Sequence, residues 1–157
     1  MSKTNFEKVV EFHELGGFTS PVKSILPDVS EMRLGFRLID EEREELEEGY
    51  LNEDLENFAK ELADLLYVVY RVAFSASIDI DRVFNEVHRS NMSKFCSKQD
   101  ALDTKEAHLD KGVPCYIEGL QDGCSTEILH AVKRTEDGKI LKNIYMSEAV
   151  VEPLLTK

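Results

Sequence analysis

The sequence is poor in cysteine, and its three cysteines form no pattern typical of a disulfide framework or a zinc site. Cys96, Cys115 and Cys124 are odd in number, and no two of them have the C-x-x-C spacing of a metal-binding pair. We therefore expect three reduced thiols that serve as small packing residues.

The chain also lacks a long apolar run and an excess of positive charge. It has no stretch of about 18 apolar residues that could cross a bilayer, and its first segment, MSKTNFEKVVEFHELGG, is too polar for a signal peptide. The net charge is -12, whereas nucleic acids and anionic membranes attract basic surfaces, so neither is an expected partner. These absences predict a cytoplasmic protein.

No internal repeat, low-complexity tract or long linker divides the 157 residues, of which 42% are hydrophobic. This is enough apolar material for a core of its own. We expect a single domain over residues 1–157, mostly α: a bundle of four to five helices with a small C-terminal β-hairpin at about 113–133.

Apolar spacing and capping residues locate these elements along the chain. Asp28 with Glu31, or alternatively Ser30, is expected to cap the second helix, and Asn52 the third. The third helix is apolar on nearly every side towards its end, which predicts a central helix or one buried in an oligomer interface. The predicted helices cover 5–15, 28–49, 52–77, 79–91 and 100–112, and the predicted strands are VPCYIEGL and TEILHAVKR, joined by the turn QDGCS.

The acidic run DEEREELEEGY raises the question of function, because neighbouring acids on a helix repel each other. Glu41 and Glu45 continue the stripe that Leu34 and Leu38 begin, and Glu42 lies at its edge. A solvated helix face therefore explains the outer acids of the run but not these three.

The third helix repeats this pattern in the sequence ELAD. Glu61 precedes Leu65 by four residues, and Asp64 precedes Val68 by four, so both acids share a face with apolar residues. Antiparallel packing of the two helices would bring Glu61 and Asp64 to Glu42 and Glu45. Half-buried carboxylates repel each other unless a cation joins them or some stay protonated. Oxygen ligands without His or Cys suit Mg²⁺ or Mn²⁺, and a solvated acidic rim is the alternative.

These motifs resemble the EExxE and ExxD signature of the all-α NTP pyrophosphatases, the MazG-like and phosphoribosyl-ATP pyrophosphohydrolase-like group that includes dimeric dUTPases. EEREEL supplies the first motif and ELADLLYVVYRVA the second. DIDRVFNEVHRSNMSKF is similar to the family segment whose Asn and Lys approach the nucleotide phosphates, here Asn91 and Lys94. DGKILK is similar to a later basic turn, with Lys139 and Lys142. The predicted hairpin departs from the minimal family pattern.

The resemblance implies Mg²⁺-dependent hydrolysis of a nucleoside triphosphate between the α and β phosphates, with Mn²⁺ as a possible substitute. The metal would be held by Glu42, Glu45, Glu61 and Asp64. Glu41 would act as general base, or alternatively as a further ligand. The family also forms homodimers or homotetramers.

Two rival functions remain at the level of the sequence. One is phosphoribosyl-ATP hydrolysis by the same site, although the hairpin and HRSNMSK favour deoxynucleotides and a role in nucleotide-pool house-cleaning. The other is a noncatalytic helical dimerisation protein.

Overall fold

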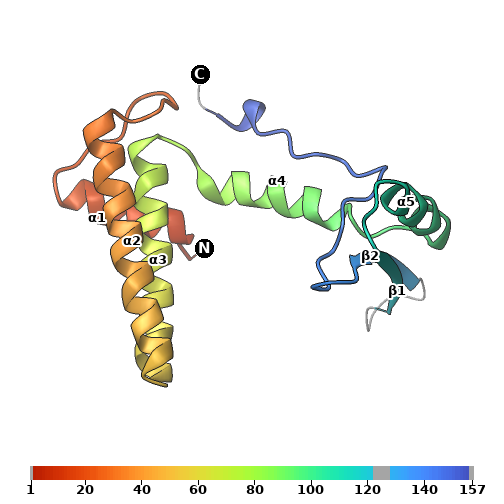
Figure 1. Ribbon diagram of the computed structural model, residues 1–157. Helices are drawn as coiled ribbons and strands as arrows, with labels where there is room; N and C mark the ends of the chain where they lie inside the picture. Colours follow the sequence, from red (N-terminus) through yellow and green to blue (C-terminus); the bar gives the residue numbers. More distant parts are fainter. Residues whose placement is uncertain (1, 122–127, 156–157) are drawn as a thin grey trace. The chain divides into compact units, whose positions relative to one another are not determined.

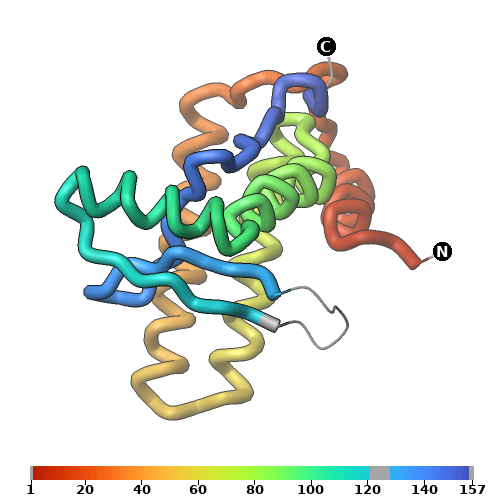
Figure 2. Tube along the Cα trace, turned by 90° about the vertical axis from the view of Figure 1, so that its right-hand side faces the viewer, coloured from red at the N-terminus to blue at the C-terminus, as the bar shows by residue number. Residues whose placement is uncertain are grey.

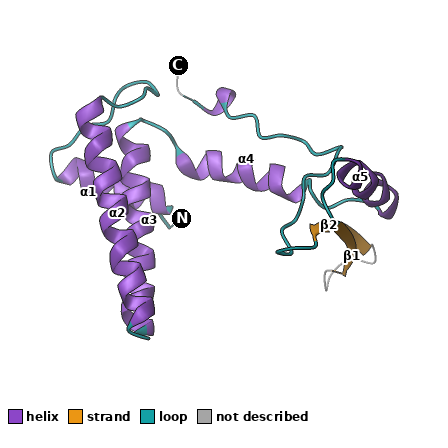
Figure 3. Ribbon diagram, viewed as in Figure 1, coloured by secondary structure: helices purple, strands orange, loops and turns teal. Residues whose placement is uncertain are grey.

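The computed structural model of the protein describes residues 2–121 and 128–155. Within them the chain is mostly helical and carries one antiparallel two-stranded hairpin (Figure 3), which confirms the predicted fold class. None of the helices in these residues is both long enough and apolar enough to pass through a lipid bilayer. The elements are α1 (Asn5–Leu15), α2 (Val29–Leu51), α3 (Leu55–Ser75), α4 (Ile80–Met92), α5 (Lys98–Asp110), β1 (Cys115–Gln121), β2 (Ile128–Arg134) and the 3₁₀ turn η1 (Glu152–Leu154).

The described chain forms two compact units. The first contains the residues up to Phe84 together with those from Val151 onward, and the second contains Asn85–Val150. α4 begins in the first unit and ends in the second.

The first unit is dominated by α2 and α3, which run antiparallel, side by side, and are joined by a short turn (Figures 1 and 2). Two glycines of α2 let the helices approach closely. A Cβ at Gly35 would lie 2.8 Å from Cγ2 of Val72, and a Cβ at Gly49 would lie 3.0 Å from the backbone nitrogen of Phe58. The close approach fixes how side chains on the two helices face each other.

The turn between α2 and α3 corrects one sequence prediction. Asp54, and not Asn52, caps α3: its Oδ1 accepts a hydrogen bond from the backbone N–H of Asn57 at 3.0 Å. Asn52 instead ends α2. The physical reason is Glu53, whose φ of 55° breaks the helical path between them, so α3 can begin only after it.

α1 packs against α3 in the first unit. Thr4 and Glu7 form a capping box at its start. His13, near the end of α1, is buried, and its Nδ1 lies 2.8 Å from the carbonyl oxygen of Val9. The centroid of its ring lies 5.0 Å from the ring centroid of Phe74. Asp28 caps α2 as predicted, accepting from the backbone N–H groups of Ser30 and Glu31.

In the second unit, α5 contacts both strands of the hairpin. The strands pair in register from Cys115 opposite Arg134 to Gln121 opposite Ile128. Cys96 and Cys115 are buried free thiols beside Ala101 and Val132, as expected for packing residues. Burial raises the pKa of both thiols. Cys124 and the rest of the predicted QDGCS turn after Gln121 lie outside the described residues.

Candidate metal centre

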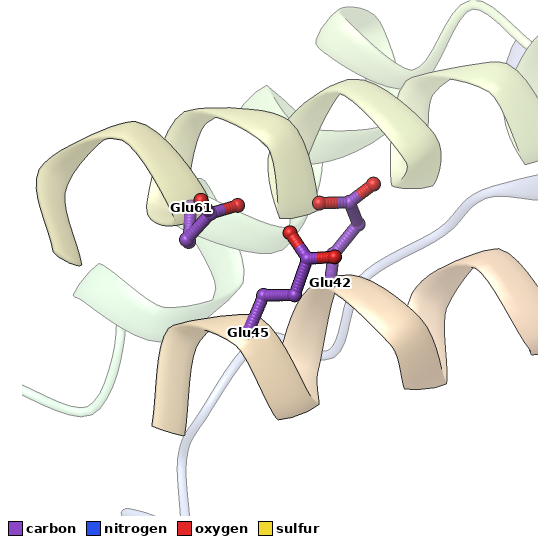
Figure 4. Close-up of side chains that lie close together, drawn as sticks. All are labelled: Glu42, Glu45 and Glu61. Atoms are coloured by element: carbon purple, nitrogen blue, oxygen red, sulfur yellow. The ribbon is translucent and has the colours of Figure 1, made fainter. Parts of the chain in front are cut away.

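The antiparallel pair of α2 and α3 brings together three of the predicted ligands. Glu42 and Glu45 lie one turn apart on α2, and Glu61 faces them from α3 (Figure 4). One carboxylate oxygen from each residue lies within 4.8 Å of the corresponding oxygens of the other two. We call these three residues the carboxylate cluster.

Burial increases across the cluster from α2 to α3. Glu45 is exposed, Glu42 is half-buried, and Glu61 is only 3% exposed. Oε2 of Glu61 is buried and has no hydrogen-bond partner among the described residues. A buried carboxylate oxygen without a partner loses its hydration and gains nothing in return. It is therefore the atom of the cluster that most needs a cation.

The pKa values of the two α2 carboxyls, Glu42 and Glu45, are also raised by burial and by neighbouring negative charge. Burial raises the pKa of Glu42, and the neighbouring negative charges of Glu45, Asp64, Glu61 and Glu41 raise it further. The charge of Glu61 raises the pKa of Glu45, with burial and a hydrogen bond to Glu61 adding to the effect and Lys60 opposing it. The ionised cluster is thus electrostatically unfavourable without a positive partner.

The fourth predicted ligand, Asp64, lies one turn after Glu61 on α3 and does not join the cluster within 4.8 Å. Its Oδ2 instead lies 3.0 Å from Nζ of Lys60, and the same ammonium lies 2.8 Å from Oε1 of Glu61. Lys60 therefore links Asp64 to the buried member of the cluster. Its position was missed from the sequence, although a lysine directly before the ExxD motif stands at i,i+4 to the aspartate, a spacing that favours ion pairs.

The remaining acids of the run in α2 divide as the stripe predicts. Glu41 is exposed next to the cluster, and its charge raises the pKa of both Glu42 and Glu45. Glu44 and Glu47 are exposed and pair with Arg43, at 3.6 and 3.1 Å. Part of the run is therefore ordinary solvated surface.

The residues predicted to contact phosphates belong to the second unit. Nζ of Lys94 donates to Oδ1 of Asn91 at 2.7 Å. Lys142 pairs with Glu148 at 3.4 Å, and the backbone N–H of Lys139 donates to Asp137 in the predicted turn. Their role towards a nucleotide stays a prediction.

The first unit also contains a cavity of about 500 Å³ between α1, the segment after it and the end of α3. Its walls include the rings of His13, Phe18 and Phe74. Arg71, another lining residue, is held by Glu31 at 2.8 Å. No sequence pattern predicted this cavity, because residues distant along the chain form it.

Residues 23–91, which contain both acidic motifs, match the phosphoribosyl-ATP pyrophosphohydrolase family. That family is part of the MazG-like all-α NTP pyrophosphatase superfamily, which the two acidic motifs resemble. The match covers a little under half of the chain and includes all of α2 and α3, so the carboxylate cluster lies entirely within it.

One curated relative aligns with part of this chain, and its description names no function. It is the "Uncharacterized protein L479" of Acanthamoeba polyphaga mimivirus, 35% identical over 86 residues. The aligned region covers 54% of this chain but only 34% of that protein. The chain thus spans about a third of the length of this relative.

Proposed function

We propose that the protein is an Mg²⁺-dependent nucleoside triphosphate pyrophosphohydrolase that cleaves its substrate between the α and β phosphates, releasing the monophosphate and pyrophosphate. The proposal rests on one observation above the others. Within the segment that matches a pyrophosphohydrolase family, a buried carboxylate with an unpartnered oxygen, Glu61, faces two further carboxylates, Glu42 and Glu45.

The donors of the cluster fit the proposed metal. All three are carboxylates, without a histidine or cysteine, and hard oxygen donors suit Mg²⁺ and Mn²⁺. The unpartnered Oε2 of Glu61 and the raised pKa values of Glu42 and Glu45 both support a cation at this site. When bound, such a metal neutralises phosphate oxygens and acidifies water.

Each side chain then has a defined task. Glu42, Glu45 and Glu61 would hold the metal, with Asp64 as the fourth ligand. Glu41 is exposed beside the cluster, where it can accept a proton from an attacking water. Its alternative role is that of a further ligand. Asn91 and Lys94, and with them Lys139 and Lys142, would contact the phosphates of the substrate.

Two substrate classes fit this site. We favour a (d)NTP, which would make the protein a house-cleaning enzyme of the nucleotide pool. Phosphoribosyl-ATP is the second candidate, and the description of the matching family favours it. A panel of both substrate classes separates them, because the phosphoribosyl-ATP enzyme must release pyrophosphate from that compound in preference to simple nucleotides.

We also propose that the protein works as a homodimer or homotetramer. The side chains of Leu66 and Val69 in α3 are 56% and 40% exposed in the single chain. Apolar side chains that gather on an exposed helix face commonly form an interface. Light scattering coupled to size exclusion measures the state directly, and a monomer at micromolar concentration contradicts this part of the proposal.

The deciding experiment is pyrophosphate release from canonical and modified NTPs, dNTPs and phosphoribosyl-ATP in Mg²⁺. Glu42→Gln and Asp64→Asn should each lower kcat/KM by more than about a hundredfold, because each removes a ligand that stabilises the transition state. Glu44→Gln is the matched control, since it removes a charge from the solvated side of the same helix. Equal turnover in all four proteins would refute the site. A noncatalytic dimerisation protein would release no pyrophosphate from any member of the panel.

A further inference from the structure

We propose that Lys60 is a built-in competitor for the divalent cation: its ammonium pairs with one oxygen each of Glu61 and Asp64, and its positive charge lowers the affinity of these carboxylates for a metal. This inference rests on the metal site of the proposed function. It assigns a role to a residue outside the acidic motifs.

The geometry places one ammonium between two carboxylates on the same helix. Nζ of Lys60 lies 2.8 Å from Oε1 of Glu61 and 3.0 Å from Oδ2 of Asp64. Both distances are those of charge-assisted hydrogen bonds. The ammonium thus uses one oxygen from each of two predicted ligands, including the buried one.

Burial shows which partner can move. The Lys60 side chain is 63% exposed, whereas that of Glu61 is 4% exposed. Glu61 is buried between the helices, whereas most of the Lys60 side chain already lies in solvent. Lys60 is therefore the partner that can turn away when a metal binds.

The charge of Lys60 makes displacement, and not deprotonation, the means of release. The ordinary pKa of a lysine is about 10.4, so the ammonium of Lys60 stays charged near neutral pH. A divalent cation carries twice this charge and can contact Glu42 and Glu45 as well. A divalent metal therefore binds in place of the ammonium once its concentration is high enough, and the charge of Lys60 raises the concentration that is needed.

An ordinary i,i+4 surface pair is the competing interpretation, and it predicts a different result. Such a pair adds a few tenths of a kcal/mol to helix stability and has no effect on metal affinity. The test must therefore measure metal binding itself, with no nucleotide and no turnover.

The experiment is calorimetric titration of the full chain with Mn²⁺ for the wild type, Lys60→Met and Lys60→Arg. The matched control is Lys3→Met, which removes the same charge and also breaks a lysine–glutamate pair, with Glu11 at 2.5 Å. Lys60→Met should bind Mn²⁺ roughly five- to tenfold more tightly, because one opposing charge a few ångströms away is removed. Lys60→Arg keeps that charge, so it and the control should both stay within about twofold of the wild type.

The outcomes separate this inference from the proposed function. If the wild type binds Mn²⁺ and Lys60→Met binds it equally or more weakly, the competitor role is wrong while the metal site stands. If the wild type and Lys60→Met both fail to bind Mn²⁺, the metal site itself is wrong, and the inference is lost with it. Melting curves in EDTA establish that each variant is folded before it is titrated.

Discussion

Replacing Glu61 with glutamine should stabilise the metal-free protein and abolish its stabilisation by metal. Two like charges within 4.8 Å repel by about 1 kcal/mol in water and by about 3.5 kcal/mol at an effective dielectric constant of 20. The substitution removes two such repulsions, with Glu42 and Glu45, and one attraction, with Lys60. Because Glu45 and Lys60 are exposed, the lower figure applies. At the lower figure the two repulsions amount to about 1.7 kcal/mol, and the attraction to Lys60 at 2.8 Å offsets about 1.5 kcal/mol of this, so the pair energies nearly cancel. The gain comes from removing the desolvation cost of a buried charge, and a gain of about 1 kcal/mol corresponds to a Tm about 2–4 °C higher for a chain of this size.

The assay is thermal melting in EDTA and in millimolar Mg²⁺ or Mn²⁺. A metal that binds only the native state must raise the Tm of the wild type, whereas Glu61→Gln should melt at the same temperature in both conditions. Glu44→Gln is the control, because it removes a solvated charge of the same helix and should retain the metal-dependent increase. A lower Tm in EDTA for Glu61→Gln, or a metal-dependent increase that survives the substitution, would refute the electrostatic argument.

Three further predictions concern the electrostatics and the frame of the site. The folded-state pKa of Glu42 is raised, so its contribution to stability is complete below the ordinary glutamate value and is lost as pH rises through the raised pKa. In EDTA, the Tm of Glu42→Gln should therefore exceed that of the wild type by more at pH 7.5 than at pH 4.5. A Tm difference that is the same at both pH values would contradict this. Gly35→Ala should lower the free energy of unfolding by about 1–3 kcal/mol, because the new Cβ would lie 2.8 Å from Cγ2 of Val72. Urea unfolding measures this free energy, and adding Val72→Ala should restore part of the loss if the clash is the cause. Asp54→Ala should cost about 1 kcal/mol through loss of the α3 cap, and Asn52→Ala clearly less, which the same unfolding assay can compare.

The sequence predicted most of the local structure because the relevant signals are local. Asp28 accepts hydrogen bonds at the start of α2 as predicted, and the change to alternating apolar residues marked both strands. The cap of α3 was assigned to the wrong residue because it depends on the left-handed backbone of Glu53. Nothing in the pattern of side chains requires that conformation at a glutamate.

The candidate site was predictable in part, because stripes on two helices show which residues face each other. That reasoning predicted that carboxylates of the two helices would converge, and the structure brings Glu42, Glu45 and Glu61 together. It could not give the depth of burial of Glu61 or the pairing of Asp64 with Lys60, because both depend on how closely α2 and α3 pack. The phosphate contacts depend on long-range arrangement, and local patterns carry no information about it.

The central claim is that α2 and α3 jointly hold one divalent cation, and anomalous diffraction from Mn²⁺-soaked crystals tests it most directly. We predict an anomalous peak bounded by the carboxylates of Glu42, Glu45 and Glu61, at coordination distances of about 2 Å. Crystals that show no peak there, with the three carboxylates turned into bulk water, would contradict the account.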